Sequence, residues 1–437
     1  MRVNSLNVLS APKENSFSHE QVNRIVDQLL QKNFEQFKIE KNRLIPRTRV
    51  ERVWSHLPWN RAESHQSVRS LLNKLHAFYE KKIGYNGCLP RSSKDFFFRI
   101  LPKTDSTLFD RSKISVKMQH CLSPELHKLK NAKSVGVDYA IAQAKLADAL
   151  GVKPRISKKG WTKALIYTDL TGREIGIFKV ARKKIDFISR LQDLLGYRIW
   201  GFNKPAYYCR SQGALPDFFS EIAAASVDDF LKYALIPPTT LTTLQDQLGS
   251  FMLWVHGGRS PDSYKIQKNC FYASEIETYQ KFVVEDFLIG NIDRHNDNWF
   301  YHEENGHISS IFAIDNANSF LEKNPSTQTL KGKWTSFWAR RHQYQWKEFR
   351  LADIPLLPKI KTAIKKLTPL TVDRIFRHIG NRFPKTLDSD AFFSSEMRAK
   401  FYQRARVLQK AGRKTNMTPR QLAYLFSDKA MQEFLNP

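Results

Sequence analysis

The most constraining feature of this chain is a short polar segment followed closely by an apolar run. Residues 291–300 read N-I-D-R-H-N-D-N-W-F, and the run at 308–314 ends immediately before Asp315. Such a run predicts a buried strand, which would hold Asp315 on a rigid element at the mouth of a cleft. Asp293, Asn298 and Asp315 supply an acid and two hard oxygen ligands, the set that phosphoryl transfer from magnesium-bound ATP requires.

Two simpler interpretations of residues 291–300 are an ordinary polar loop and a calcium-binding loop. The segment lacks the regularly alternating ligands and the central glycine of an EF-hand loop, which argues against the second interpretation. The first interpretation has to be weighed against motifs elsewhere in the chain.

The pattern resembles the kinase-like superfamily in its lipid-kinase branch, most closely the type II phosphatidylinositol 4-kinases. Their catalytic loop reads roughly D-R-x-N-D-N-W and their metal-binding motif reads A-I-D-N-G. This chain has D-R-H-N-D-N-W at 293–299 and A-I-D-N-A at 313–317. The D-R-H-x-x-N form, with His295, is also similar to phosphoinositide 3-kinases, bacterial HipA-like kinases and secretory-pathway casein-type kinases.

The resemblance continues upstream and implies an α+β fold. Residues 161–169 and 174–180 are expected to form two strands, and the second resembles the G-x-F-K strand whose lysine, here Lys179, contacts ATP phosphates. The helix expected at 216–233 resembles the one whose glutamate, here Glu221, pairs with that lysine. A lysine at a strand edge and a surface glutamate are the alternatives. The implied architecture is a bilobal protein-kinase-like fold, with a small β-rich lobe and a larger helical lobe.

The nucleotide-binding elements are less distinct in the sequence. A phosphate-covering loop is expected just before the first strand, where Ser157, Gly160 and Thr162 are candidates, although the family's loop is richer in glycine and serine. Residues 249–255 resemble the strand that leads into the hinge. The backbone around Trp254 and Val255 is therefore expected to hydrogen-bond adenine.

The resemblance also implies roles in catalysis. ATP would be the phosphate donor, and Asn298 and Asp315 would hold Mg²⁺ or Mn²⁺. Asp293 would orient or deprotonate the acceptor hydroxyl, while Lys179, fixed by Glu221, would bind the α- and β-phosphates. His295 would neutralise charge near the γ-phosphate or serve only a structural purpose.

The net charge of the chain is extreme and predicts a polyanionic partner. Its 437 residues include 70 Lys and Arg against 42 Asp and Glu, a formal charge of +28. A surface of this sign attracts anionic membranes, phosphoinositides and inositol phosphates. Nucleic acid is a weaker candidate because no DNA- or RNA-binding motif is visible. The best candidate surface is the segment 396–414, unless it is simply a solvated basic helix; its predicted polyanion-binding residues are Arg398, Lys400, Arg404, Arg406, Lys410 and Arg413.

Four divisions of the chain are expected. The first, 1–150, is a helical N-terminal extension, although residues 96–101 could form a buried strand. The kinase small lobe would occupy 151–256 and the large lobe 257–384. A basic helical module at 385–437 would bind phosphoinositides or inositol phosphates.

The sequence also suggests where the protein acts. It shows no secretory signal, no apolar stretch that could span a bilayer, and four scattered cysteines without a disulfide or C-x-x-C pattern. We therefore expect a cytoplasmic protein that works peripherally at an anionic membrane. Bacterial effectors delivered into host cells include kinases of this kind, and the sequence permits that origin.

The acceptor of the phosphoryl group is the open question. Type II lipid kinases carry a palmitoylated cysteine cluster near the small lobe, whereas this chain has only Cys209 between Lys179 and Glu221. The motif D-R-H-x-x-N also occurs in protein-phosphorylating relatives. The sequence analysis therefore slightly favours a protein kinase regulated by phosphoinositides or inositol phosphates over a phosphatidylinositol 4-kinase. A phosphoinositide-binding pseudokinase is the third alternative, and the intact motif residues argue against it.

Overall fold

The described part of the chain falls into two compact units. The computed structural model describes residues 19–31, 37–40, 43–46, 69–81, 91–104, 109–129, 136–157, 164–181, 217–263, 271–321, 344–384 and 393–436. One unit comprises Met1–Lys159 and Leu165–Gly176, and the other comprises Gly160–Ala164 and Ile177–Pro437. Among the described helices, none is long and apolar enough to cross a membrane.

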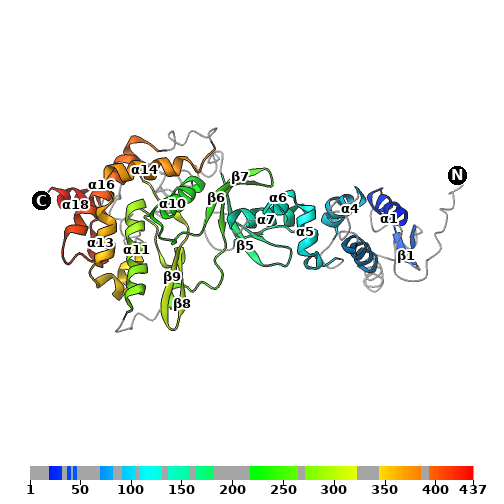
Figure 1. Cartoon of the computed structure of the whole chain (residues 1–437), viewed down its shortest axis with the longest axis horizontal. Helices are drawn as coiled ribbons and strands as arrows, with labels where there is room; N and C mark the ends of the chain where they lie inside the picture. The colour runs from blue at the N-terminus through cyan, green and yellow to red at the C-terminus, as the bar shows by residue number, and fades with distance from the viewer. Residues whose placement is uncertain are drawn as a thin grey trace, which may run out of the picture. The chain divides into compact units, whose positions relative to one another are not determined.

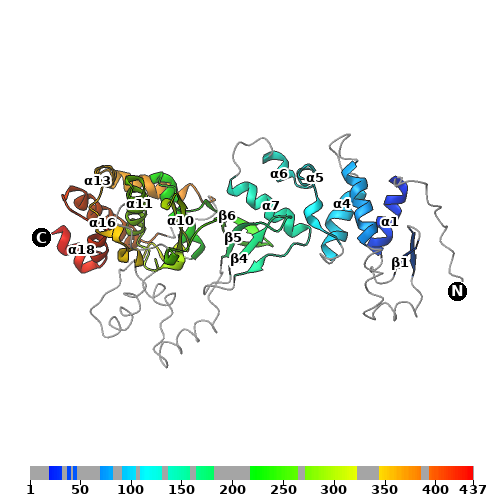
Figure 2. The same ribbon diagram turned by 90° about the horizontal axis from the view of Figure 1, so that it is seen from below.

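The N-terminal unit is mainly helical (Figures 1 and 2). Its core is rich in aromatic side chains, and Tyr79, Phe96, Phe97 and Phe109 pack against one another through their rings. Besides a helix at 69–81, the helices and strands are α1 (His19–Gln31), β1 (Phe37–Glu40), β2 (Arg43–Pro46), α4 (Arg91–Asp95), α5 (Val116–Leu122), α6 (Pro124–Leu129), α7 (Val137–Ala149), β3 (Arg155–Ile156) and β4 (Leu165–Thr168).

The buried strand expected at 96–101 is wrong. Phe96–Ile100 forms a π-helical turn that continues α4, and Leu101–Lys103 adds a 3-10 turn. Phe96, Phe97 and Leu101 are buried, as the prediction required. A short apolar run of this length suits a buried helix as well as a buried strand, so its composition could not separate the two.

A five-stranded sheet has the strand order β3-β4-β5-β7-β6. Its strand β5 (Glu174–Val180) confirms the strand expected there, and the division between the two units falls within it, after Gly176. In the C-terminal unit, β6 (Thr239–Leu244) pairs antiparallel with β7 (Gln247–Leu253). The strand β6 begins only at Thr239, because the preceding Pro237 and Pro238 have no N–H to donate to a ladder.

The C-terminal unit is built around α11 (Ala273–Ile289), which Figure 1 shows between the β8–β9 hairpin and the C-terminal helices. The helix α10 (Asp217–Leu231) packs against β6 and β7. The small antiparallel sheet and these helices confirm the predicted α+β class, which is consistent with a kinase-like fold. The remaining elements are β8 (Trp299–Glu304), β9 (His307–Ala313), α13 (Pro358–Lys365), α14 (Pro369–Gly380), α16 (Ser395–Arg413), α17 (Pro419–Tyr424) and α18 (Asp428–Leu435).

The strand β9 confirms the buried strand expected before Asp315, and a tight turn positions it. Asn305 and Gly306 connect β8 to β9, with φ values of 51° and 79°. Asn-Gly is favoured in two-residue hairpins because both positions need positive φ. This hairpin places Asn298, just before β8, next to Ile314, just after β9, and the Ile314 N–H donates to the Asn298 carbonyl over 2.9 Å.

The described C-terminal residues share the core of the C-terminal unit. Phe401 and Leu408 of α16 are buried in the same hydrophobic cluster as Phe287 of α11 and Ile375 of α14. The sequence predicts a separate module at 385–437. In the structure, the apolar face of α16 covers α11 and α13.

Gly249 allows β7 to approach β5 closely. A Cβ atom at this position would lie 2.3 Å from the carbonyl oxygen of Lys179 and 2.8 Å from the Phe178 ring. Because the first of these atoms is backbone, it cannot move aside cheaply. We expect Gly249→Ala to lower the free energy of unfolding by about 1–3 kcal/mol, as overpacking does, in denaturant titrations. The neighbouring Leu248→Ala, at a partly exposed position, serves as the control. Equal unfolding midpoints for Gly249→Ala and the wild type would contradict the predicted close approach.

Candidate active site

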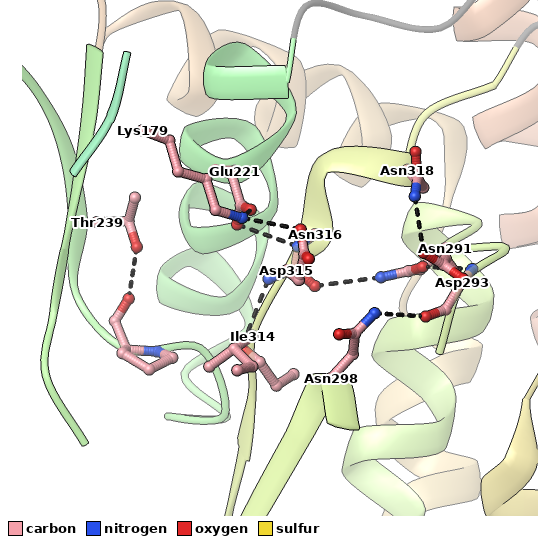
Figure 3. Close-up of polar contacts among 12 residues, drawn as sticks. Lys179, Glu221, Thr239, Asn291, Asp293, Asn298, Ile314, Asp315, Asn316 and Asn318 are labelled. Carbon is pink, nitrogen blue, oxygen red and sulfur yellow. Dashed lines mark hydrogen bonds and ion pairs between the residues drawn. The ribbon is translucent and has the colours of Figure 1, made fainter. Parts of the chain in front are cut away.

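The loop that follows α11 is folded around Asp293. The helix ends at Gly290 with φ of 68°, a conformation that glycine adopts without strain. The Asn291 side chain then accepts the Asp293 N–H over 2.9 Å, and the Asn298 Nδ2 donates to the Asp293 carbonyl over 2.7 Å. The Asp293 carboxylate in turn accepts a hydrogen bond of 3.0 Å from Asn318 Nδ2. Figure 3 shows these amides gathered around the carboxylate.

Asp315 follows β9 after one intervening residue. It lies on the side of Asn298 that faces away from Asp293 (Figure 3). Its backbone is left-handed, with φ of 53°, which an aspartate tolerates better than most residues. In Figure 3 the amide oxygen of Asn298 points away from Asp293, because its nitrogen is used by the Asp293 carbonyl. The structure therefore brings Asp293, Asn298 and Asp315 together, as neighbours on one loop and one hairpin.

Lys179 of β5 lies between two carboxylates. Its Nζ contacts Glu221 of α10 and lies 2.8 Å from Asp315 Oδ1. The other oxygen of Glu221 accepts the Asn316 N–H over 3.0 Å, so α10 is also tied to the segment after β9 (Figure 3). The motifs predict the pair of Lys179 and Glu221 but not the contact of Lys179 with Asp315.

The charges of this cluster explain its pKa shifts. Burial alone would lower the pKa of Lys179, but the carboxylates of Asp315 and Glu221 outweigh it and raise that pKa. Burial would raise the pKa of Asp315, yet the adjacent Lys179 brings it below its usual range. Burial raises the pKa of Glu221. The lysine is therefore firmly protonated and ready to meet an anion such as a phosphate.

Arg294, which the sequence analysis assigned no role, connects the parts of the site. Its side chain is fully buried, and Nε lies 3.0 Å from both carboxylate oxygens of Asp286 on α11. Its Nη1 donates to the carbonyls of Asn298 and Ile314, and its Nη2 donates to the Asn316 side chain. One guanidinium thus joins α11, the catalytic loop and the segment that carries Asp315.

His295 lies at the edge of the cluster. Its Nδ1 accepts the Asp297 N–H over 3.2 Å, so a neutral ring carries its proton on Nε2. That nitrogen lies 4.0 Å from Asp293 Oδ1, which is too far for a direct hydrogen bond. The position suits either of the roles considered for this residue.

The candidate adenine-binding residues follow β7. Trp254 and Val255 are partly exposed and extend the chain beyond the last β6–β7 pair. Ser157 follows β3 in the N-terminal unit, whereas Gly160 and Thr162 lie outside the described residues. Their roles in nucleotide binding stay predictions.

Of the six predicted polyanion-binding residues, only Arg406 and Arg413 are exposed. Lys400 pairs with Asp428 over 2.7 Å, and Lys410 donates to the Leu435 carbonyl over 3.2 Å. The Arg398 guanidinium lies 4.8 Å from the centre of the Phe376 ring. Arg404 is fully buried, so the prediction of a surface position for it is wrong. Its place in a basic segment predicts a surface position, although α16 turns this side chain toward α11.

Several site residues escaped the sequence analysis. Asp286 precedes the catalytic loop by a full turn of helix, and Asn316 and Asn318 follow Asp315. The dense run of amides was visible in the sequence, but its partners lie across long separations. The Arg294–Asn316 contact, for example, spans 22 residues.

Comparison with known families agrees with this geometry. Residues 259–404 match the family described as phosphatidylinositol 3- and 4-kinase, and this segment includes the catalytic loop and β9. This match indicates that the protein is a phosphotransferase, and it supports ATP as the phosphate donor. No curated protein matches it. The finer resemblances to type II enzymes, to HipA-like kinases and to effectors stay predictions.

The donor set of this phosphotransferase suits a divalent cation. A carboxylate oxygen of Asp315 and the amide oxygen of Asn298 are hard ligands of the kind that Mg²⁺ and Mn²⁺ prefer. The Asn298 nitrogen is already engaged by the Asp293 carbonyl, which leaves its oxygen for a ligand. A bound ion would neutralise phosphate charge here, and these residues do not distinguish Mg²⁺ from Mn²⁺.

Asp293 is expected to give the reaction a dependence on pH. Burial, followed by the charge of Asp315, raises the pKa of Asp293 to about 6. A general base must be ionised, so turnover should rise as pH increases through about 6 and then level off. Asp293→Asn should lower kcat by about 10²–10⁴-fold and abolish that rise. The exposed loop neighbour Asp297, changed to Asn, is the control. A pH profile of Asp293→Asn that matches the wild type would exclude Asp293 as the base.

Proposed function

We propose that the protein transfers the γ-phosphate of ATP to an inositol hydroxyl of a phosphatidylinositol lipid. The observation that supports this most is the convergence of Lys179, Asp293, Asn298 and Asp315 in one site. Three of these four residues lie inside the segment that matches the phosphatidylinositol 3- and 4-kinase family. The choice of a lipid acceptor rests on that family match.

Each residue has a proposed task in this reaction. Lys179, held by Glu221, would bind the α- and β-phosphates after exchanging its contact with Asp315 for one with the nucleotide. Asp293, oriented by Asn318, would accept the proton of the attacking hydroxyl. Asn298 and Asp315 would hold the divalent cation. Catalysis would rest on positioning and charge neutralisation rather than on a covalent intermediate.

A protein acceptor is the second candidate, and two features of the sequence favour it. The D-R-H-x-x-N loop is shared with protein-phosphorylating relatives, and Cys209 alone cannot supply a palmitoylated cluster. In this alternative, phosphoinositides or inositol phosphates would regulate the enzyme. A pseudokinase is disfavoured by the paired Lys179 and Glu221 and by the intact acidic residues of the site.

Transfer of labelled phosphate from ATP tests the acceptor. Purified protein is offered phosphatidylinositol vesicles or generic proteins, each with Mg²⁺ or Mn²⁺ and with or without inositol phosphates, and Asp315→Ala is the inactive control. We expect label in the lipid. Label in protein alone would replace the lipid-kinase proposal by the protein-kinase one. ATP binding without any transfer would favour the pseudokinase.

We also propose that a basic surface on α13 and α16 binds anionic lipid. The two helices pack together, with Gly412 against Ile364 and the Gln409 side chain donating to the Lys365 carbonyl over 3.2 Å. Around this seam, exposed cations come from both helices and from the residues that follow them. None forms an ion pair with another described residue; they are Lys365, Lys366, Arg406, Arg413 and Lys414. Unpaired cations gathered in this way attract an anionic bilayer.

Charge reversal tests this surface. The double variant Arg406→Glu and Arg413→Glu should lose most of its binding to vesicles that contain phosphatidylinositol phosphates in sedimentation assays, since each basic residue near a membrane contributes about 1 kcal/mol. Lys117→Glu with Lys128→Glu, exposed in the N-terminal unit, makes the same change in net charge. Equal loss in both double variants would mean that net charge, not this surface, governs binding.

For its location, we propose that the protein is a cytoplasmic enzyme held peripherally at an anionic membrane. Delivery into a host cell as a bacterial effector is a further proposal.

A further inference from the structure

Arg404 of α16 is a buried cation that forms no ion pair with a carboxylate among the described residues. Its Nε donates to the Leu288 carbonyl over 2.9 Å, while Nη1 and Nη2 have no hydrogen-bond partner in the part of the chain that the structure describes. Burial lowers the pKa of Arg404 to about 10, which still leaves it charged at neutral pH. A buried charge of this kind is costly, and an apolar side chain of similar length would satisfy the core better.

The guanidinium contacts the end of α11, just before the catalytic loop. Leu288 contributes one of the last carbonyls of the helix, where the negative end of the helix dipole favours a cation. The next contact is with Gly290, where a Cβ atom would lie only 2.7 Å from the Arg404 Cζ. Arg404 therefore packs against the residue at which the chain leaves the helix and turns toward Asp293.

The same face of α16 supports the segment that follows Asp315. Phe401, one turn before Arg404, stacks on Phe320 with ring centroids 6.0 Å apart and an interplanar angle of 5°. The Phe320 N–H donates to the Ile289 carbonyl over 2.8 Å. Two neighbouring side chains of α16 thus hold the end of α11 and the segment 316–320 at the same time.

These supports lead to Asp293 by two short routes. From Gly290 the chain reaches Asp293 in three residues, through the turn that the Asn291 side chain closes. From Phe320 it leads back to Asn318, whose carbonyl accepts the Ile292 N–H over 3.2 Å and whose side chain donates to Asp293 Oδ2 over 3.0 Å. The placement of the catalytic carboxylate therefore depends on both segments that α16 holds.

We propose that Arg404 is a positioning residue that fixes the end of α11 and thereby sets the placement of Asp293. The contacts of Arg404 described above do not include any of the residues proposed to bind ATP, the metal ion or the acceptor. The inference rests on the phosphotransferase activity and not on the identity of the acceptor. It explains why a costly buried cation occupies a site where an apolar residue would pack.

Arg404→Met tests the proposal, because methionine keeps the length and removes the charge and the donor. We expect kcat for ATP turnover to fall by about 10–100-fold, the effect of a small misplacement of a reacting group. KM for ATP should change less than about twofold, because Lys179 and the adenine-binding segment are untouched. The melting temperature should change little, because removal of the costly buried charge offsets loss of the hydrogen bond to the Leu288 carbonyl. Arg404→Lys, which keeps a charge and a donor, should recover part of kcat.

The matched control is Arg377→Met on α14, where the same change is made at an exposed position that forms no ion pair with another described residue. It should leave kcat, KM and melting temperature unchanged. ATP hydrolysis without added acceptor is measured beside transfer to lipid. If the wild-type protein hydrolyses ATP but transfers no phosphate to lipid, the lipid acceptor is wrong and the inference about Arg404 still stands.

Gly290→Ala supplies an independent measurement of the same contact. Alone it should lower kcat, because its Cβ meets the Arg404 guanidinium and its φ of 68° is strained for alanine. Combined with Arg404→Met, it should cost less than it does alone, since the clash has gone. A wild-type kcat in Arg404→Met would overturn the proposal. A fold-loss of kcat in the double variant that equals the product of the two single losses would also overturn it, because the two residues would then act independently. Should Arg404→Met fail to fold, wild-type kcat in both Arg404→Lys and Gly290→Ala would overturn it.

Discussion

The buried pair of Arg294 and Asp286 is the interaction on which the rest of the catalytic unit depends. Both side chains are removed from water, and such a desolvation costs several kcal/mol per ion unless every polar atom finds a partner. Here the carboxylate also accepts a hydrogen bond of 3.1 Å from Trp346, and the guanidinium satisfies three further acceptors. Because the partners of Arg294 belong to three segments, the helix, the loop and the strand end must assemble together.

The surroundings of Lys179 have the opposite character, because the carboxylates there outnumber the ammonium group that they share. Glu221 and Asp315 share the single ammonium of Lys179, and Asp293 lies close enough for the Asp315 charge to affect its pKa. Excess negative charge favours a divalent cation, which Asp315 and Asn298 would hold and which would neutralise phosphate charge there. Without a ligand, Lys179 and Asp315 thus pair with each other. Each would be available to a bound metal–nucleotide complex once that pair separates.

The sequence predicted the parts of this site that are local and missed those that are distant. The catalytic loop, β5, β9 and the pair of Lys179 and Glu221 could be expected because short motifs specify them. The partners of Arg294 could not be predicted, because some of them lie far from it in the chain. The burial of Arg404 could not be predicted either, because the spacing of residues on a helix does not say which element covers each face. The prediction of a strand at 96–101 was wrong for a related reason. The apolar composition of this segment reflects its burial and does not distinguish a helix from a strand.

The way in which α11 ends has a consequence for the order of folding. Its last carbonyls are satisfied by groups that come much later in the chain, and the bond from Arg404 to Leu288 spans 116 residues. Contacts of such long range form slowly, because the intervening loop must close first. During synthesis, α11 and the catalytic loop leave the ribosome well before α16 does. A nascent chain that has emerged only as far as Asp315 therefore already holds Lys179, Asp293, Asn298 and Asp315, but the groups that close the end of α11 have still to follow.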